Sequence, residues 1–182
     1  MKVVSTLISA SLLIGSVSAI LGGWKIPQGS KTYVTGLRST VDPKSPDDFS
    51  FCGGALISPT HVLTTASCTT TASANFPSKY KPVKLPAPGG ADIRSGTNAD
   101  CSKATKSTVD NSQVCAGGAQ GKSPCQGDTG GPFIKENGRG DADDVLVGLV
   151  SGGSGCGVNG SPAIYSRVSS AVPWINTAMK TK

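Results

Sequence analysis

The chain has 182 residues, 24 of them glycine, and carries a formal net charge of +6. This length corresponds to about one domain, and a glycine content roughly twice the usual one favours a turn-rich β protein over a helical bundle. The basic residues form no run and aromatic residues make up only 5% of the chain, which argues against nucleic-acid binding. A single histidine excludes a histidine-rich zinc site, and we expect neither a metal nor a cofactor.

The first 19 residues have the pattern of a secretory signal peptide. A basic start at Met1 and Lys2 is followed by a mainly apolar stretch and by small residues at 17–19, where a signal peptidase would cut. The alternative, a membrane anchor, fits so short a stretch less well, and no later segment approaches the roughly 20 apolar residues of a membrane span. We therefore expect residues 1–19 to be a signal peptide and residues 20–182 to be one secreted domain.

The first part of the expected secreted domain shows strand patterns and one long polar stretch. Residues 31–38 alternate apolar and polar side chains, and residues 52–58 and 61–66 are predicted to be neighbouring strands joined by a tight turn. Residues 69–100 contain several prolines and few apolar side chains, so we interpret them mainly as loop.

The second part is predicted to contain a hairpin, a further strand and a helix. Residues 131–136 and 144–150 would pair around an Asn-Gly turn, and residues 163–168 would form another strand. Residues 171–180 can form one short helix, with Pro173 near its first turn.

Three segments carry most of the information about the family of the chain. They are Ile-Leu-Gly-Gly at 20–23, the run from Cys52 to Cys68, and Cys-Gln-Gly-Asp-Thr-Gly-Gly-Pro at 125–132. Together they resemble the trypsin/chymotrypsin-like serine protease family. Weaker matches follow the order of that family at 80–86, 114–118, 150–153 and 165–169. The resemblance implies an all-β fold, a trypsin-like double β-barrel with shortened or incomplete barrels and a short C-terminal helix.

The cysteines are expected to be paired, because a secreted domain lies in an oxidising environment. Six cysteines allow many different pairings, and spacing alone does not choose among them. The family resemblance implies three bridges, which are Cys52–Cys68, Cys101–Cys115 and Cys125–Cys156.

The catalytic positions depart from the pattern of active family members. Ser67 stands where active members have the histidine that acts as general base, and Thr129 stands where they have the nucleophilic serine. The Ser67 hydroxyl cannot accept a proton at neutral pH as an imidazole can, and the methyl group of Thr129 crowds the point of attack. The resemblance therefore implies a degenerate catalytic site and a protein that is not an enzyme.

The third member of the triad, an aspartate on a strand between these two positions, has no counterpart among the predicted elements. Asp92, Asp100 and Asp110 lie there, but in loop-like contexts. His61 lies about 20 Å from the base position along an extended chain and is interpreted as a surface turn residue. Residues 151–153, Ser-Gly-Gly, lack the tryptophan with which active members line the edge of the substrate site.

Other parts of the family's machinery are retained. The resemblance implies an ion pair between a new amino terminus at Ile20 and the carboxylate of Asp128. It also implies an oxyanion-hole remnant formed by the amides of Gly127 and Thr129. Ser123 occupies the floor of the substrate pocket, where it would not favour a basic side chain. The alternative for Asp128 is a solvated remnant without a partner.

A secreted member of this family without its triad resembles the glucanase inhibitor proteins of oomycete plant pathogens. Those proteins bind plant endo-β-1,3-glucanases outside the cell and limit the release of glucan fragments that alert the host. The resemblance implies an effector in the host apoplast whose partner is a host plant endo-β-1,3-glucanase, with no nucleic-acid or membrane partner. The alternatives are another secreted pseudoprotease that serves as a binding or adhesion module, a weakly active serine protease, and a shortened nonfunctional product.

Three smaller features have more than one interpretation. Asn159 begins an Asn-Gly-Ser glycosylation sequon, but the proline that follows it often weakens modification. Residues 141–144 could bind calcium, but we prefer a solvated acidic loop, because no glycine or later acid completes a calcium loop. Trp24 and Trp174 are interpreted as packing residues rather than as platforms for carbohydrate.

Overall fold

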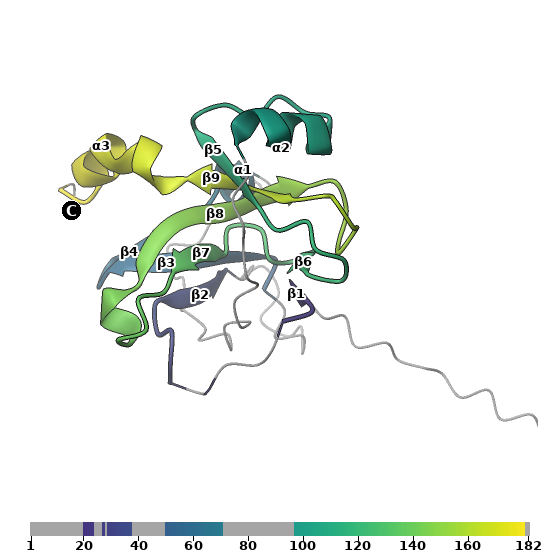
Figure 1. Cartoon of the computed structure of the whole chain (residues 1–182). Helices are drawn as coiled ribbons and strands as arrows, with labels where there is room; N and C mark the ends of the chain where they lie inside the picture. The colour runs from purple at the N-terminus through teal and green to yellow at the C-terminus, as the bar shows by residue number, and fades with distance from the viewer. Residues whose placement is uncertain (1–19, 24–26, 28, 38–49, 71–96, 181–182) are drawn as a thin grey trace, which may run out of the picture.

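A computed structural model of the chain describes residues 20–23, 27, 29–37, 50–70 and 97–180 (Figure 1). The described chain is mainly β structure with a short helix at its C-terminal end, as the sequence predicts. Several predictions fall outside the described residues, namely the signal peptide at 1–19, Trp24, most of the loop at 69–100 and the motif at 80–86.

The first half of the domain forms a three-stranded antiparallel sheet in the order β2-β3-β4. Its strands are β2 (Val34–Leu37), β3 (Cys52–Ser58) and β4 (His61–Leu63). The predicted tight turn at residues 59–60 joins β3 to β4, because Ser58 pairs with His61 across it. β2 begins later than predicted, since Lys31 has a positive φ of 52° and turns the chain before the strand.

The second half forms a four-stranded antiparallel sheet in the order β5-β9-β8-β7. In chain order its strands are β5 (Gln113–Ala116), β7 (Pro132–Lys135), β8 (Val145–Gly153) and β9 (Ala163–Arg167). The predicted hairpin consists of β7 and β8, and the strand predicted at 163–168 is β9. The last strand of the chain is thus an inner strand of the sheet, where β5 and β8 flank it.

A two-stranded ribbon attaches the start of the described chain to the second half. It consists of β1 (Ile20–Leu21) and β6 (Ser123–Pro124). Gly22 follows β1 with a φ of 66°, and a Cβ atom at this position would collide with the carbonyl of Gly121. Only glycine therefore allows this close approach of the two segments.

The helices are short. They are α1 (Ala66–Thr70), α2 (Asn98–Thr105), a 3₁₀ turn η1 (Asp141–Asp143) and α3 (Val168–Ala178). The sequence predicted neither α1 nor α2, although Thr97 caps α2 by accepting a hydrogen bond from the N–H of Asp100. α3 begins earlier than predicted, so Pro173 lies inside the helix and not in its first turn. No helix in the described ranges is long and apolar enough to span a bilayer.

Ile175 of α3 joins the cores of the two halves. It is buried in one cluster with Leu149 of the second sheet and with Ala55 and Leu63 of the first sheet. Figure 1 shows α3 at the end of β9, and the helix also contacts β8. Because the halves share this cluster, they bury their apolar faces against one another as a single unit.

The three predicted disulfides are present. Cys52–Cys68 links β3 to α1, Cys101–Cys115 links α2 to β5, and Cys125–Cys156 links the segments that follow β6 and β8. The bridges span sequence separations of 16, 14 and 31 residues. In the chain-entropy description each contributes about 3 kcal/mol to the free energy of unfolding.

Candidate functional site

The two degenerate catalytic positions belong to segments that meet between the two halves. Ser67 is on α1 of the first half, and Thr129 is in the turn between β6 and β7 of the second half. The backbone N–H of Gly53 donates to the carbonyl oxygen of Thr129 at 2.7 Å, and the Sγ atom of Cys68 lies 3.5 Å from the same oxygen. The structure therefore brings the segments of Ser67 and Thr129 together, as the family resemblance implies.

Glycines make this close junction possible. Gly130 has a φ of 82°, and a Cβ atom there would collide with Oγ1 of Thr64 and with the carbonyl of Gly53. A Cβ atom on Gly53 would lie 2.7 Å from the Cα atom of Gly131. These distances leave no room for side chains, so close packing at the junction explains the glycines at 53 and 130.

Ser67 does not provide a general base. The residue is exposed, and its hydroxyl lies 3.2 Å from Oγ1 of Thr65. A hydroxyl keeps its proton at neutral pH, so it can share a hydrogen bond but cannot take the proton of Thr129.

His61 does not replace the missing base. Its Nδ1 atom lies 2.8 Å from the hydroxyl of Ser58 and 2.9 Å from that of Thr60, within the turn between β3 and β4. This turn lies at the opposite end of β4 from α1, which carries Ser67. His61 is the half-buried first residue of β4, directly after the turn, and not a surface turn residue as the sequence suggested.

The described acidic residues between Ser67 and Asp128 accept hydrogen bonds from residues two or three positions away in the sequence. The hydroxyl of Thr97 donates to Asp100 at 2.7 Å. The hydroxyl and the N–H of Ser112 donate to Asp110 at 2.6 and 2.8 Å, and these bonds lower the pKa of Asp110. Asp92 lies outside the described residues, so the absence of the third triad member stays a prediction.

Asp128, next to Thr129, is a half-buried carboxylate for which a nearby cation would offset the cost of burial. Burial raises the pKa of Asp128 to about 6, although the N–H of Cys125, which donates to it at 2.7 Å, acts in the opposite direction. Ile20 pairs with Pro124 in the β1–β6 ribbon, so the predicted mature start lies beside the segment that leads to Asp128. In the uncut chain the nitrogen of Ile20 belongs to a peptide bond, and only cleavage would turn it into an amine.

On the side of the site that would face a substrate, one hydroxyl is used in hydrogen bonds within the chain, and one position carries no side chain. The buried hydroxyl of Ser123 donates to the carbonyl of Pro124 at 2.9 Å and accepts from the N–H of Gly157 at 2.7 Å. Gly152, on the edge where active members place a tryptophan, has open space around the position of a Cβ atom. Gly127 has a φ of 93° in the turn before Thr129, and the oxyanion-hole remnant of these two amides stays a prediction.

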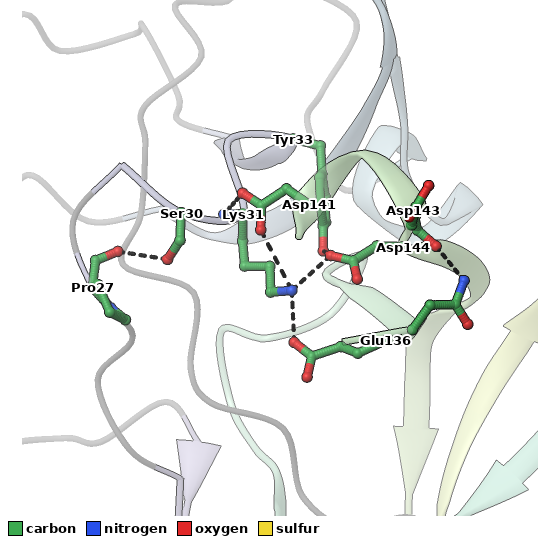
Figure 2. A network of polar contacts seen from close by, with 9 residues as sticks. Pro27, Ser30, Lys31, Tyr33, Glu136, Asp141, Asp143 and Asp144 are labelled. Atoms are coloured by element: carbon green, nitrogen blue, oxygen red, sulfur yellow. Dashed lines mark hydrogen bonds and ion pairs between the residues drawn. The ribbon is translucent and has the colours of Figure 1, made fainter. Parts of the chain in front are cut away.

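A charged cluster that sequence analysis missed joins the two halves at a second place (Figure 2). The Nζ atom of Lys31 lies 2.6 Å from Glu136, 2.6 Å from Asp144 and 3.5 Å from Asp141. The N–H of Lys31 also donates to Asp141, and the hydroxyl of Tyr33 donates to Asp144 at 2.7 Å. No local pattern could indicate this cluster, because Lys31 and Asp141 are 110 residues apart in the sequence.

This cluster corrects the interpretation of residues 141–144 as a solvated acidic loop. Only 3% of the side chain of Asp144 is exposed. Burial alone would raise the pKa of Asp144, but the hydrogen bonds from Lys31 and Tyr33 outweigh it and hold the pKa below its usual value. Asp141 and Asp144 thus serve as partners of the half-buried Lys31. In the described part of the chain, no group of histidine, cysteine or acidic residues has the arrangement of a metal site.

Two other surface features are placed by the structure. Trp174, interpreted as a packing residue, is 63% exposed on α3, so that interpretation is wrong. Asn159 is exposed, whereas the hydroxyl of Ser161 in the same sequon is buried and has no hydrogen-bond partner among the described residues. Glycosylation of Asn159 stays a prediction.

Comparisons with known proteins agree with this geometry. The chain matches the trypsin family over residues 87–175. It is 39% identical over 263 aligned positions to glucanase inhibitor protein 1 of Phytophthora infestans, covering 100% of this chain and 99% of that protein. It is 38% identical over 266 positions to glucanase inhibitor protein 2 of Phytophthora sojae, covering 100% and 90%. It is 37% identical over 266 positions to glucanase inhibitor protein 3 of Phytophthora infestans, covering 100% of both proteins.

The first of these alignments also shows that the chain is shortened internally. It spans 263 positions while the chain has 182 residues, so at least 81 of the positions are gaps in this chain. Because the alignment takes in 99% of the relative, these gaps lie within the matched region. A trypsin-like β fold and a similarity that runs along the whole chain lead to one conclusion: the chain belongs to the family of the glucanase inhibitor proteins.

Proposed function

We propose that this chain is a secreted, catalytically inactive serine-protease homologue that binds host plant endo-β-1,3-glucanases and inhibits them. Full-length similarity to proteins named glucanase inhibitor proteins, together with Ser67 and Thr129 at the catalytic positions, carries the proposal. Acting in the host apoplast as an effector, the protein would suppress the release of glucan fragments that elicit plant defence.

Secretion is supported by the sequence and by the disulfides. Residues 1–19 have the pattern of a signal peptide, and cleavage after Ala19 would release residues 20–182. All six cysteines are paired, which fits an oxidising compartment.

The protein would lack the side chains that drive peptide hydrolysis in active family members. Ser67 cannot take a proton from Thr129, and in well-studied proteases the loss of triad members lowers turnover by roughly 10⁴- to 10⁶-fold. An oxyanion hole formed by the amides of Gly127 and Thr129 would by itself support only a residual rate. The retained junction would therefore present a binding surface rather than perform catalysis.

Signal cleavage would also complete the structure near Thr129. The freed amine of Ile20 would provide the cation for Asp128, and a buried carboxylate is costly without a partner. The β1–β6 ribbon already holds Ile20 opposite Pro124. The protein would thus mature in one cut, with no separate activation step.

One observation favours a second candidate, a binding or adhesion module with a different partner. At least 81 aligned positions of glucanase inhibitor protein 1 have no counterpart in this chain, so surfaces that serve the relative can be missing here. The exposed Trp174 on α3 adds an apolar surface of the kind that anchors protein interfaces.

A single mixing experiment tests both candidates. The mature protein is combined with a panel of acidic and basic plant endo-β-1,3-glucanases, and complex formation is measured by size-exclusion chromatography alongside hydrolysis of a soluble β-1,3-glucan. We expect a complex and a loss of hydrolysis that follows its amount, with acidic glucanases associating faster because the chain is basic. The reduced and alkylated protein is the control.

The outcomes separate the two candidates. No complex with any glucanase in the panel would contradict the proposal, and a complex that leaves hydrolysis unchanged would support the binding module. Cleavage of peptide substrates above background would contradict the claim that the protein is inactive.

A further inference from the structure

The two halves of the domain touch along a seam that involves β3 and β7. At one end the N–H of Gly53 donates to the carbonyl of Thr129. In the middle Ala55 of β3 shares an apolar cluster with Leu149 and Ile175 of the second half. The first end is held by backbone contacts and the middle by apolar packing.

Lys31 closes the other end of the seam (Figure 2). Lys31 precedes β2 in the first half, whereas its three carboxylate partners belong to the connection between β7 and β8 in the second half. Each of these ion pairs therefore crosses from one half to the other. The left-handed φ of 52° at Lys31 is a conformation that residues with side chains rarely adopt, and here both the N–H and the Nζ atom of Lys31 contact Asp141.

Apolar packing between the halves includes Ile57 and Leu146, which pack against the cluster of Ile175, but it leaves a gap next to the charged residues. An open pocket of about 150 Å³ lies there, lined by residues 55–57 of β3, by Ile134 and Leu146 of the hairpin, and by Tyr33 and Asp144 of the cluster. Close-packed side chains normally hold neighbouring elements in one arrangement, and the gap makes that constraint weaker here than at the cluster of Ile175. Among the described residues, the charged cluster adds ion pairs and hydrogen bonds to these apolar contacts at this end of the seam.

We propose that the contacts of Lys31 and Tyr33 with Asp144 form a latch that sets the orientation of the two halves. With the latch closed, Gly53 is held against Thr129 at the far end of β3. With the latch open, the sheet of β2, β3 and β4 pivots about the cluster at Ile175, and the pocket widens. Replacement of Lys31 opens the latch, because it leaves the Asp144 carboxylate, whose side chain is only 3% exposed, without its cation. Replacement of Tyr33 weakens the latch by removing one of the hydrogen bonds that Asp144 accepts.

Hydrogen exchange of the folded protein tests the latch. The variants are Lys31→Met, Tyr33→Phe and Glu136→Gln, and Lys103→Met on the exposed face of α2 is the control with the same change of charge. We expect the amides of β2 and β3 to exchange on the order of tenfold faster in Lys31→Met and severalfold faster in Tyr33→Phe. Glu136→Gln should have the smallest effect, since 59% of the side chain of Glu136 is exposed. The amides of β5, β8 and β9 should keep their rates.

Two results would overturn the proposal. One is equal acceleration in both halves, which would indicate general loss of stability rather than an opened seam. The other is an exchange pattern in Tyr33→Phe and Lys31→Met that matches the Lys103→Met control. If Lys31→Met does not fold, Tyr33→Phe decides, because it retains Lys31 and the ring that lines the pocket and removes one hydroxyl.

Discussion

The two ends of the seam between the halves are held by different kinds of contact. At the Thr129 end, glycine residues let backbone pack on backbone, and the N–H of Gly53 donates directly to the Thr129 carbonyl. At the Lys31 end, charged side chains form ion pairs beside an open pocket. The first kind of contact tolerates no added atom, whereas the second depends on a balance of charges.

This difference explains how the glycines of a catalytic motif can serve the structure alone. The sequence at 127–131 is Gly-Asp-Thr-Gly-Gly, with a threonine in place of the serine of the family motif, and Gly130 occupies a position that a side chain would block. The motif keeps a structural role at the junction of the halves even where Thr129 performs no reaction. Glycines in such a motif are therefore poor indicators of catalysis.

The largest effect is expected from a substitution that disrupts the backbone contacts at the Thr129 end of the seam. Gly130→Ala should lower the free energy of unfolding by about 4 kcal/mol, because a left-handed φ is costly for alanine and the Cβ atom overlaps Thr64 and Gly53. Gly138→Ala is the matched control: Gly138 has a φ of 72° but no atom within 4 Å of the Cβ position, so about 1 kcal/mol is expected. Urea unfolding measures both variants, and equal losses would show that the junction is not close-packed.

The next largest effect is expected from a substitution in the charged cluster at the Lys31 end of the seam. Asp144→Asn should cost about 2 kcal/mol, since it removes the least exposed carboxylate partner of Lys31 while Glu136 and Asp141 remain. Asp143→Asn removes a neighbouring carboxylate whose partner, Arg139, is 78% exposed, and should cost less than about 0.5 kcal/mol. The same unfolding measurement compares them. A loss in Asp143→Asn as large as in Asp144→Asn would contradict a role for burial.

An effect of similar size concerns Asp128 and the pH dependence of stability. In the uncut chain, the raised pKa of about 6 means that the folded state binds the proton of Asp128 more tightly than the unfolded state. Stability from this group is therefore present below about pH 4 and is lost, by about 2 kcal/mol, as the pH rises through about 6. Asp128→Asn should remove this dependence.

A chain that begins at Ile20 should show the opposite sign. An amine paired with Asp128 would hold the pKa of the carboxyl below its usual value, so stability would be present at neutral pH and lost on acidification. Thermal unfolding between pH 3 and 7 compares the two chains. Identical profiles would mean that the ion pair does not form.

Sequence analysis succeeded where the information is local or ordered along the chain. The Pro-Thr turn at 59–60 joined β3 to β4, and the family resemblance gave the three disulfides. The predicted pairing of β7 with β8 is also present, although the longer connection 136–144, which includes η1, joins them instead of an Asn-Gly turn alone. It failed for α2, because a short helix with a polar cap and few apolar residues resembles a loop in composition. It also failed for Lys31 and Asp144, since nothing near either residue indicates a partner in the other half.

The central claim is that binding at this degenerate site involves no catalysis, and one measurement tests it most directly. The double variant Ser67→Ala/Thr129→Ala and the unmodified mature protein are titrated into a plant endo-β-1,3-glucanase, and hydrolysis of a soluble β-1,3-glucan is followed. Because neither hydroxyl takes part in a reaction, we expect the concentrations that give half-maximal inhibition to agree within about twofold for the two proteins. A change of about 1.4 kcal/mol in the binding free energy would instead shift this concentration about tenfold. Loss of inhibition by a double variant that circular dichroism shows to be folded would contradict the claim.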